Sequence, residues 1–287
     1  MSDGDDAYGA TIAKRRLSRI LTDLRRRTGM HGNHICDRLS WGRGKVGRFE
    51  ANVWRRPEMS DIRDLLRVYE ADEKTRQEVE DLAILARGRA WWRDSYWKEV
   101  FDDGEFPGFE SDASEIRTCL PLILPGLLQT EAYIRTQMRV GTKDDEWRER
   151  ALRGRLRRQA ILDRDERAPK LIAVITEAAL CYRWGGAEEQ REQLQRLIEM
   201  SRRPHVELRV LRFADGPHPG MNSLINAFTF PYDDEPPMVY LETDTSMTEV
   251  SPKEAKSYLD LFERIRASAA PETESAAFLN TLAEKLE

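Results

Sequence analysis

The sequence has little of what disulfide frameworks, zinc sites and common catalytic centres require. Its three cysteines, Cys36, Cys119 and Cys181, lie far apart and form no CxxC pair, which excludes a disulfide framework and the usual zinc spacings. We expect all three to be small buried residues. The four histidines form no HExxH pair, and the chain contains neither a GxSxG sequence nor a glycine-rich phosphate loop. We therefore predict that the protein is not an enzyme and that it holds no metal and no cofactor.

Long hydrophobic runs are missing as well. The longest apolar stretch, residues 119–128, covers about half of a membrane span and contains Pro121 and Pro125. The first ten residues are acidic and polar, whereas a secretory signal needs a cationic start followed by an apolar stretch. We expect a cytoplasmic protein without a membrane segment.

The chain has 287 residues, a length that favours two domains. Its charged residues are abundant but unevenly distributed along the sequence. The formal net charge is -5, yet residues 14–67 hold fifteen basic and six acidic side chains, a local charge of +9. The rest of the chain therefore carries -14. This asymmetry favours a polyanionic partner for the N-terminal part, although a solvated helical surface would have the same composition.

The N-terminal part has the pattern of a bundle of five helices. Apolar residues recur at helical spacing from Leu17 to Leu24, and Gly29 follows them as a helix C-terminus requires. We expect four further helices over residues 32–39, 43–51, 60–69 and 73–89.

The segment GNHICDRLSWGRGKVGRF, residues 32–49, has the pattern of two short helices joined by a tight turn. It resembles the XRE-type helix-turn-helix domain, the family of lambda and Cro-like phage repressors, over residues 10–69. The apolar positions of the motif are matched by Ile35, Leu39, Val46 and Phe49, and small Cys36 falls where the two helices touch. The resemblance implies that the second helix enters the major groove of double-stranded DNA.

The same resemblance implies roles for individual residues. Arginine is the side chain best suited to bidentate contacts with guanine, so Arg43 and Arg48 are the expected specificity residues. The positions expected to face bases are Arg43, Gly44 and Arg48, and those expected near phosphates are Lys45, Asn52, Trp54, Arg55 and Arg56.

Two departures from the family pattern concern the turn and the second helix. Ser40 stands where the turn usually has glycine, which requires a left-handed or related backbone conformation. Each glycine inside a helix costs about 1 kcal/mol relative to alanine, so this helix should be weak by itself. The glycines concerned are Gly42, Gly44 and Gly47. Three alternatives are open for this helix. Packing within the domain stabilises it, contact with DNA completes its folding, or the DNA-reading function is degraded in this protein.

The C-terminal part mixes strands and helices. Short β-branched or aromatic runs predict strands, and longer amphipathic segments predict helices. The expected strands are residues 171–176, 206–212, 227–230 and 238–242, and the expected helices include residues 144–163 and 188–201. The SPKE sequence at Ser251 is a capping box that starts a further helix. The helix over residues 144–163 is rich in arginine, and this basic face either binds an acidic partner or forms salt bridges with nearby carboxylates.

Three further residues allow a functional or a structural interpretation. Trp91 and Trp92 form either an aromatic ligand or partner surface or a packing contact between the two domains. His218, in the sequence GPHPG, either faces a ligand pocket or is a turn residue bonded to the backbone. In both cases the structural interpretation is the simpler one.

A second resemblance extends over nearly the whole chain. The sequence SEIRTCLPLILPGLLQTEAYIRT, from Ser114, and the later DGPHPG, residues 215–220, resemble the actinobacterial regulator family to which WhiJ belongs. Members pair an XRE domain with a long C-terminal domain. The resemblance implies a transcriptional regulator of developmental or antitoxin-like systems, whose C-terminal domain binds a small protein encoded nearby.

The combined expectation is an α+β protein in which an all-α, lambda-repressor-like helix-turn-helix bundle precedes a larger mixed α+β domain. Its parts are an acidic tail (1–11), the DNA-binding domain (12–90), a connecting segment (91–113) and a regulatory or partner-binding domain (114–287). The function expected is sequence-specific DNA binding by a homodimer, tuned by a partner or effector. The alternative is an antitoxin-like adaptor that binds a protein and for which DNA binding is secondary.

Overall fold

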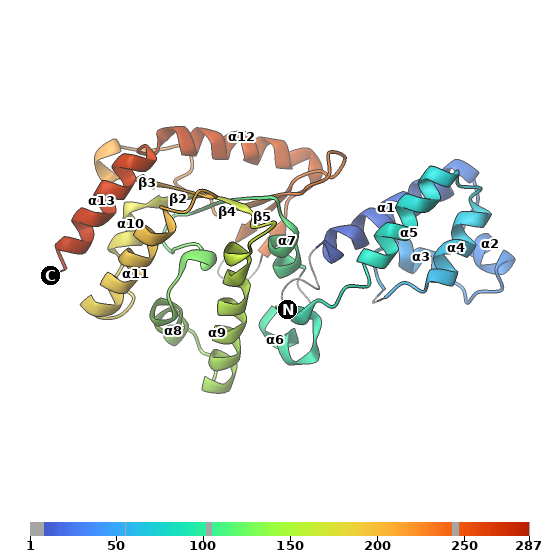
Figure 1. Ribbon diagram of the computed structural model, residues 1–287, viewed down its shortest axis with the longest axis horizontal. Helices are drawn as coiled ribbons and strands as arrows, with labels where there is room; N and C mark the ends of the chain where they lie inside the picture. Colours follow the sequence, from blue (N-terminus) through green and yellow to red (C-terminus); the bar gives the residue numbers. More distant parts are fainter. Residues whose placement is uncertain (1–8, 55, 102–104, 243–246, 287) are drawn as a thin grey trace. The chain divides into compact units, whose positions relative to one another are not determined.

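The computed structural model describes residues 9–54, 56–101, 105–242 and 247–286 (Figure 1). The chain divides into two compact units. Unit 1 comprises Met1–Asp94 and Asp103–Asp112, and unit 2 comprises Ser95–Asp102 and Ala113–Glu287. The segment 91–113 is therefore shared, because the chain leaves unit 1, returns to it for one short helix, and leaves it again.

Unit 1 contains a bundle of five helices whose apolar stripes meet in one core. The side chains of Leu17, Ile62 and Val79, from three different helices, are fully buried there. The bounds of its helices are α1 (Ala10–Thr28), α2 (Gly32–Arg38), α3 (Lys45–Glu50), α4 (Met59–Val68), α5 (Glu73–Leu85), the 3-10 helix η2 (Trp91–Arg93) and α7 (Phe106–Asp112).

The start of α1 is capped by a residue that lies a hundred positions further along the chain. The buried carboxylate of Asp112 accepts hydrogen bonds from the backbone N–H groups of Gly9, Thr11 and Ile12 at 2.7, 2.8 and 2.9 Å. The first turn of a helix leaves such N–H groups unpaired, so α7 completes α1. The two helices approach closely at Gly108, where an added Cβ would overlap the Thr11 side chain.

Unit 2 is the mixed α+β domain that the sequence predicts. Its strands are β1 (Glu115–Leu120), β2 (Lys170–Thr176), β3 (Val206–Leu211), β4 (Ile225–Thr229), β5 (Met238–Glu242) and β6 (Met247–Glu249). Its α-helices are α6 (Lys98–Phe101), α8 (Glu131–Arg139), α9 (Asp145–Gln159), α10 (Glu177–Cys181), α11 (Ala187–Met200), α12 (Pro252–Ser268) and α13 (Glu272–Glu284). Short 3-10 helices are η3 (Ser95–Trp97), η4 (Gly126–Leu128), η5 (Ala160–Asp163) and η6 (Phe213–Asp215).

The strands form one mixed sheet in the order β3-β2-β1-β4-β5-β6. β1, β2 and β3 are parallel, and helices connect them, as crossover connections between parallel strands require. β4, β5 and β6 join as antiparallel neighbours. The sequence pattern does not predict two of the strands. Charged Glu115 and Arg117 interrupt the apolar pattern of β1, and β6 consists of three exposed residues.

Helices cover both faces of this sheet. Figure 1 shows α12 on one face and α9 and α11 on the other. Phe262 and Ile265 of α12 are fully buried against the sheet. The expected capping box of α12 does not form, because the Ser251 hydroxyl donates to the Glu254 carboxylate at 2.6 Å and caps no backbone N–H group.

The longest apolar stretch of the sequence forms the end of β1 and an irregular connection after it. Glutamine side chains bind the carbonyl groups of this connection, which have no strand or helix partner. Gln159 donates to the carbonyl oxygens of Gly126 and Gln129 at 2.8 Å, and Gln193 donates to that of Leu128 at 2.9 Å. Within the described part of the chain, no helix is long and apolar enough to span a membrane.

Candidate nucleic-acid interface

A tight turn joins α2 to α3 in unit 1. Ser40 adopts a left-handed conformation with φ of 56°, as its place in the motif requires. The N–H groups of Ser40 and Trp41 donate to the carbonyl oxygens of Asp37 and Cys36 at 3.2 and 2.7 Å. These two bonds form a Schellman ending, which stops α2 and reverses the chain direction.

Apolar packing fixes α3 against α2. Ile35 and Cys36 of α2 and Val46 and Phe49 of α3 are buried in the core of unit 1. The Phe49 ring also lies 5.8 Å from that of Trp54, between ring centres. The apolar positions of the motif thus have the structural role that the resemblance implies.

The second helix is shorter than predicted, and this changes the cost of its glycines. α3 begins at Lys45 rather than at residue 43, so Gly42 and Gly44 lie outside it and only Gly47 is internal. Gly44 is the N-cap residue, with a left-handed φ of 79° that suits glycine. Its backbone N–H donates to Oδ1 of Asn33 at 3.3 Å, which ties the start of α3 to α2.

The two arginines expected to read bases are both exposed. Arg48 lies on the solvent side of α3, and Arg43 lies in the turn just before it. Neither guanidinium has a hydrogen-bond or ion-pair partner among the residues that the structure describes. Gly44 is one of the four residues between them in the sequence, and a Cβ built there would be 4.0 Å from Nη1 of Arg48. Both guanidinium groups are therefore available to an external ligand.

The residues expected near phosphates differ in their exposure and in their contacts. Lys45 is half-buried, with Nζ 2.6 Å from Oδ1 of Asp61 and 4.2 Å from the centre of the Trp41 ring. Arg56 is exposed and donates to the carbonyl oxygen of Arg87 at 3.2 Å. Arg55 lies outside the described residues. Lys45 and Arg56 would have to give up these contacts to reach a phosphate.

Asn52 and Trp54 belong to a hydrogen-bonded chain that runs from α1 to the residue before α7. The Trp54 indole N–H donates to the Ser18 hydroxyl, which donates to Oδ1 of Asn52, both at 3.3 Å. The side-chain amide of Asn52 then donates to Oε1 of Glu105 at 3.3 Å. Sequence reasoning missed Glu105, because 53 residues separate it from Asn52 and no local pattern relates them.

Arg25 and Glu50 form a second connection that sequence reasoning missed. The guanidinium of Arg25, on α1, makes a two-point contact with the Glu50 carboxylate at the end of α3. This hydrogen-bonded contact with Glu50 raises the pKa of Arg25. The pair anchors α3 to the bundle at the end opposite to Gly44.

Trp91, Trp92 and His218, for which the sequence allows two interpretations, all contact other residues within their own unit. Trp91 and Trp92 are buried in unit 1, with their rings edge to face 5.7 Å apart. His218, in unit 2, accepts a hydrogen bond at Nδ1 from the Gly220 N–H at 3.3 Å, and burial lowers its pKa. The prediction for the cysteines is wrong at one position, since Cys181 is exposed at the end of α10.

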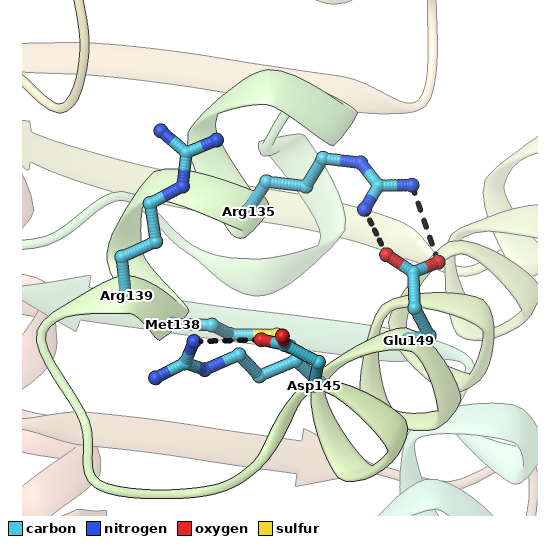
Figure 2. A pocket seen from close by; sticks show the side chains of 6 residues that line it. Arg135, Met138, Arg139, Asp145 and Glu149 are labelled. Carbon is cyan, nitrogen blue, oxygen red and sulfur yellow. Dashed lines mark hydrogen bonds and ion pairs between the residues drawn. The ribbon is translucent and has the colours of Figure 1, made fainter.

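A small pocket of about 180 Å³ lies between α8 and α9 in unit 2 (Figure 2). Two of its three arginines are neutralised inside it: Arg135 binds Glu149, and Arg148 binds Asp145 at 3.0 Å. Arg139 has no hydrogen-bond or ion-pair partner in the described residues, and Nε of Arg148 is buried without an acceptor. The pocket therefore has one cation more than it has carboxylates and suits a compact anionic group.

Two arginines of the arginine-rich helix α9, Arg148 and Arg150, form salt bridges. Besides the pairs in the pocket, Arg150 contacts Glu146 at 2.8 Å and Glu99 at 3.0 Å. Across the described ranges of the chain, no cluster of histidine, cysteine and carboxylate side chains has the arrangement of a metal site.

Two comparisons with protein families match the chain. Residues 16–79, which include α2, the turn and α3, match a helix-turn-helix domain, and this match supports DNA-binding transcription regulation. Residues 104–281 match the domain of unknown function DUF5753. No curated protein and no solved structure matches the chain. Because the DUF5753 match covers more than half of the sequence, the chain belongs to the DUF5753 family, with a helix-turn-helix domain in its N-terminal unit.

Proposed function

We propose that the protein is a sequence-specific transcriptional regulator of the XRE type, which inserts α3 and the turn before it into the major groove of DNA. The observation that carries this proposal is the state of Arg43 and Arg48. Both are exposed beside a helix held at both ends, by Asn33 and by Arg25, and neither has a partner in the described residues. A fixed helix that presents unpaired guanidinium groups is suited to bidentate contacts with guanine.

The charge of the N-terminal part supports the same proposal. A local charge of +9 over residues 14–67 attracts the phosphate backbone and speeds encounter with DNA. Such a regulator acts in the cytoplasm. Binding as a homodimer would place two α3 helices in successive major grooves, about 34 Å apart.

For unit 2 we propose the regulatory role that the WhiJ-like resemblance implies. An actinobacterial, antitoxin-like regulator of this kind binds a small partner protein or effector through its C-terminal domain. The α8–α9 pocket supports this role, because unpaired Arg139 offers a contact for an acidic group. A partner changes DNA binding only if it favours one of the states that bind DNA with different affinity.

Fluorescence anisotropy with two duplexes tests the DNA-binding proposal. The full chain is titrated with DNA from upstream of its own gene and with a scrambled duplex, each at about 0.05 and 0.2 M salt. Tighter binding to the native fragment that persists at the higher salt supports base readout. Equal binding to both duplexes that disappears with salt contradicts it and leaves only a charge effect.

The second candidate function, a protein-binding adaptor with secondary DNA binding, is favoured by the same unpaired Arg139. It predicts that the product of a small neighbouring gene binds the full chain equally well with and without the Arg43→Ala and Arg48→Ala changes. It also predicts that Arg139→Ala weakens this complex. Arg150→Ala is the matched control, since Arg150 lies on α9 but does not line the pocket.

A further inference from the structure

Three donors from separate segments of unit 1 converge on the carboxylate of Glu105. Asn52, in the turn after α3, lies 3.3 Å from Oε1 through Nδ2. Nη2 of Arg93, in η2, lies 3.8 Å from Oε1 of Glu105. Nη1 of Arg15, in α1, lies 3.9 Å from Oε2 of Glu105. Two guanidinium groups and an amide around one anionic group are the donors that proteins use for phosphate oxygens.

The amide of Asn52 is oriented for this task before any ligand arrives. The Ser18 hydroxyl donates to Oδ1 of Asn52, which leaves the NH₂ group of the amide directed at Glu105. Asn52 itself has a left-handed φ of 59° in the turn that follows the C-cap residue of α3, Ala51. The donor is therefore held by the backbone and by a neighbouring side chain rather than by Glu105 alone.

A third cationic side chain, that of Lys14, acts on Glu105. Lys14 is buried in α1 with Nζ 5.1 Å from the centre of the Trp54 ring. Its pKa is lowered to about 8, first by burial and then by the charge of Arg93, whereas the charge of Glu105 acts in the opposite direction. In the described part of the chain, the Glu105 carboxylate thus interacts with three cationic side chains, those of Lys14, Arg15 and Arg93.

We infer that Arg15, Arg93 and Asn52 form a subsite for a backbone phosphate of duplex DNA, and that the Glu105 carboxylate occupies this subsite in the free protein. The inference rests on the proposed DNA-binding function. Its place fits that function, because Asn52 follows the end of α3 by two residues and phosphates flank the groove that α3 enters. Glu105 is then an internal competitor of DNA.

The competitor is attached to a helix that links the two units along the chain. Glu105 directly precedes α7, and Asp112 at the other end of α7 caps α1. Residue Ala113, which follows, already belongs to unit 2. When the Glu105 side chain leaves the subsite, Arg15, Arg93 and Asn52 lose this carboxylate as a partner and can contact a phosphate in its place.

The exchange is energetically accessible. The side chains of Glu105 and Arg15 are each about 30% exposed, and their ion pair is long. Ion pairs of this kind contribute little, so a DNA phosphate can displace the carboxylate. We expect Glu105→Gln to raise the affinity for native and scrambled duplexes alike by about two- to fivefold, since phosphate contacts carry no sequence information.

The test separates a vacated subsite from a general loss of negative charge. DNA affinities are measured by anisotropy for the wild type, Glu105→Gln, Arg93→Gln and the double variant, with Glu78→Gln as the charge-matched control. Glu78 pairs with Arg16 at 3.1 Å in the same unit and does not contact the subsite donors. Circular dichroism checks that each variant is folded.

The expected result is a gain with Glu105→Gln that is absent in Glu78→Gln and lost when Arg93→Gln is added. The variant should also show a salt slope steeper by about one, the value for one more phosphate contact. A gain that persists in the double variant, or that Glu78→Gln reproduces, overturns the inference. If the wild type binds no duplex at all, the proposed function fails first, and the inference fails with it.

Discussion

The side-chain oxygen of Asn33, at the start of α2, accepts a hydrogen bond from the backbone N–H of Gly44, at the start of α3. Their distance of 3.3 Å joins the two helices of the motif at the point where the polypeptide chain enters α3. The bond fixes the position of Arg43 and Arg48 relative to α2, and DNA readout depends on that position.

Asn33→Ala should therefore weaken specific DNA binding without removing a direct DNA contact. The bond is exposed, so we expect a loss of about 0.5–1 kcal/mol of stability in unit 1. Asn33→Asp keeps an acceptor and serves as the control. An unchanged affinity for the native duplex in Asn33→Ala would show that α3 does not need this bond.

Ser40→Gly should stabilise the protein. The Cβ atom of serine is sterically unfavourable at φ of 56°, whereas glycine has no Cβ atom. Glycine is also more flexible in the unfolded chain, which offsets part of the gain in stability. The expected increase in the free energy of unfolding is roughly 0.5–1 kcal/mol, measured by urea denaturation. Ser40→Ala keeps the Cβ atom and should give no increase. A loss of stability in Ser40→Gly would contradict this account of the turn.

Asp112→Asn should loosen the start of α1. The carboxylate accepts three backbone N–H groups in a buried site, and a neutral amide with one acceptor oxygen cannot replace it. We expect a loss of about 1–2 kcal/mol and faster hydrogen exchange at Ile12 and its neighbours. Asp72→Asn is the control, because Asp72 is an exposed N-cap of α5 and asparagine caps equally well. Equal effects of the two changes would contradict the special role of Asp112.

Lys14 should make the stability of unit 1 depend on pH. Its pKa falls from 10.5 in the unfolded chain to about 8 in the fold, so the folded state binds this proton less tightly. The destabilising contribution is fully present below about pH 8 and disappears as the pH rises to 10.5. Lys14→Met should be more stable than the wild type by roughly 1–3 kcal/mol at about pH 7 and by less at about pH 10. Urea unfolding at the two pH values measures this difference, and a difference independent of pH would refute the prediction.

The periodic elements of this protein could be predicted from its sequence. The stripe from Leu17 to Leu24 and its terminal glycine correctly predict α1, because a buried helix face repeats every three to four residues. The second strand, β2, is a continuous apolar run, as strands buried on both faces are. The α+β class follows from such elements.

The ends and the less regular elements could not be predicted as well. Whether Gly44 lies inside a helix or caps it depends on its positive φ and on Asn33, neither of which the local pattern reveals. β1 needs its neighbours β2 and β4 to be recognised, because its own charged residues hide it.

Long-range polar contacts were the least accessible part of the candidate site. Arg43 and Arg48 could be named because they belong to a motif with fixed spacing. Glu105 meets Asn52 only because α7 returns to unit 1, and Arg25 meets Glu50 only once the bundle has formed. Pairs of this kind arise only in the tertiary fold, so the spacing of residues in the sequence does not predict them.

The central claim, that α3 and its preceding turn read DNA bases, is tested most directly by alanine substitutions at Arg43 and Arg48. Affinities for the native and the scrambled duplex are compared for each variant and for Arg67→Ala, an exposed arginine of α4 that pairs with Asp64. The account predicts a loss of about 1–3 kcal/mol on the native duplex and little loss on the scrambled one for Arg43→Ala and Arg48→Ala. Equal losses on both duplexes, matched by Arg67→Ala, would contradict it.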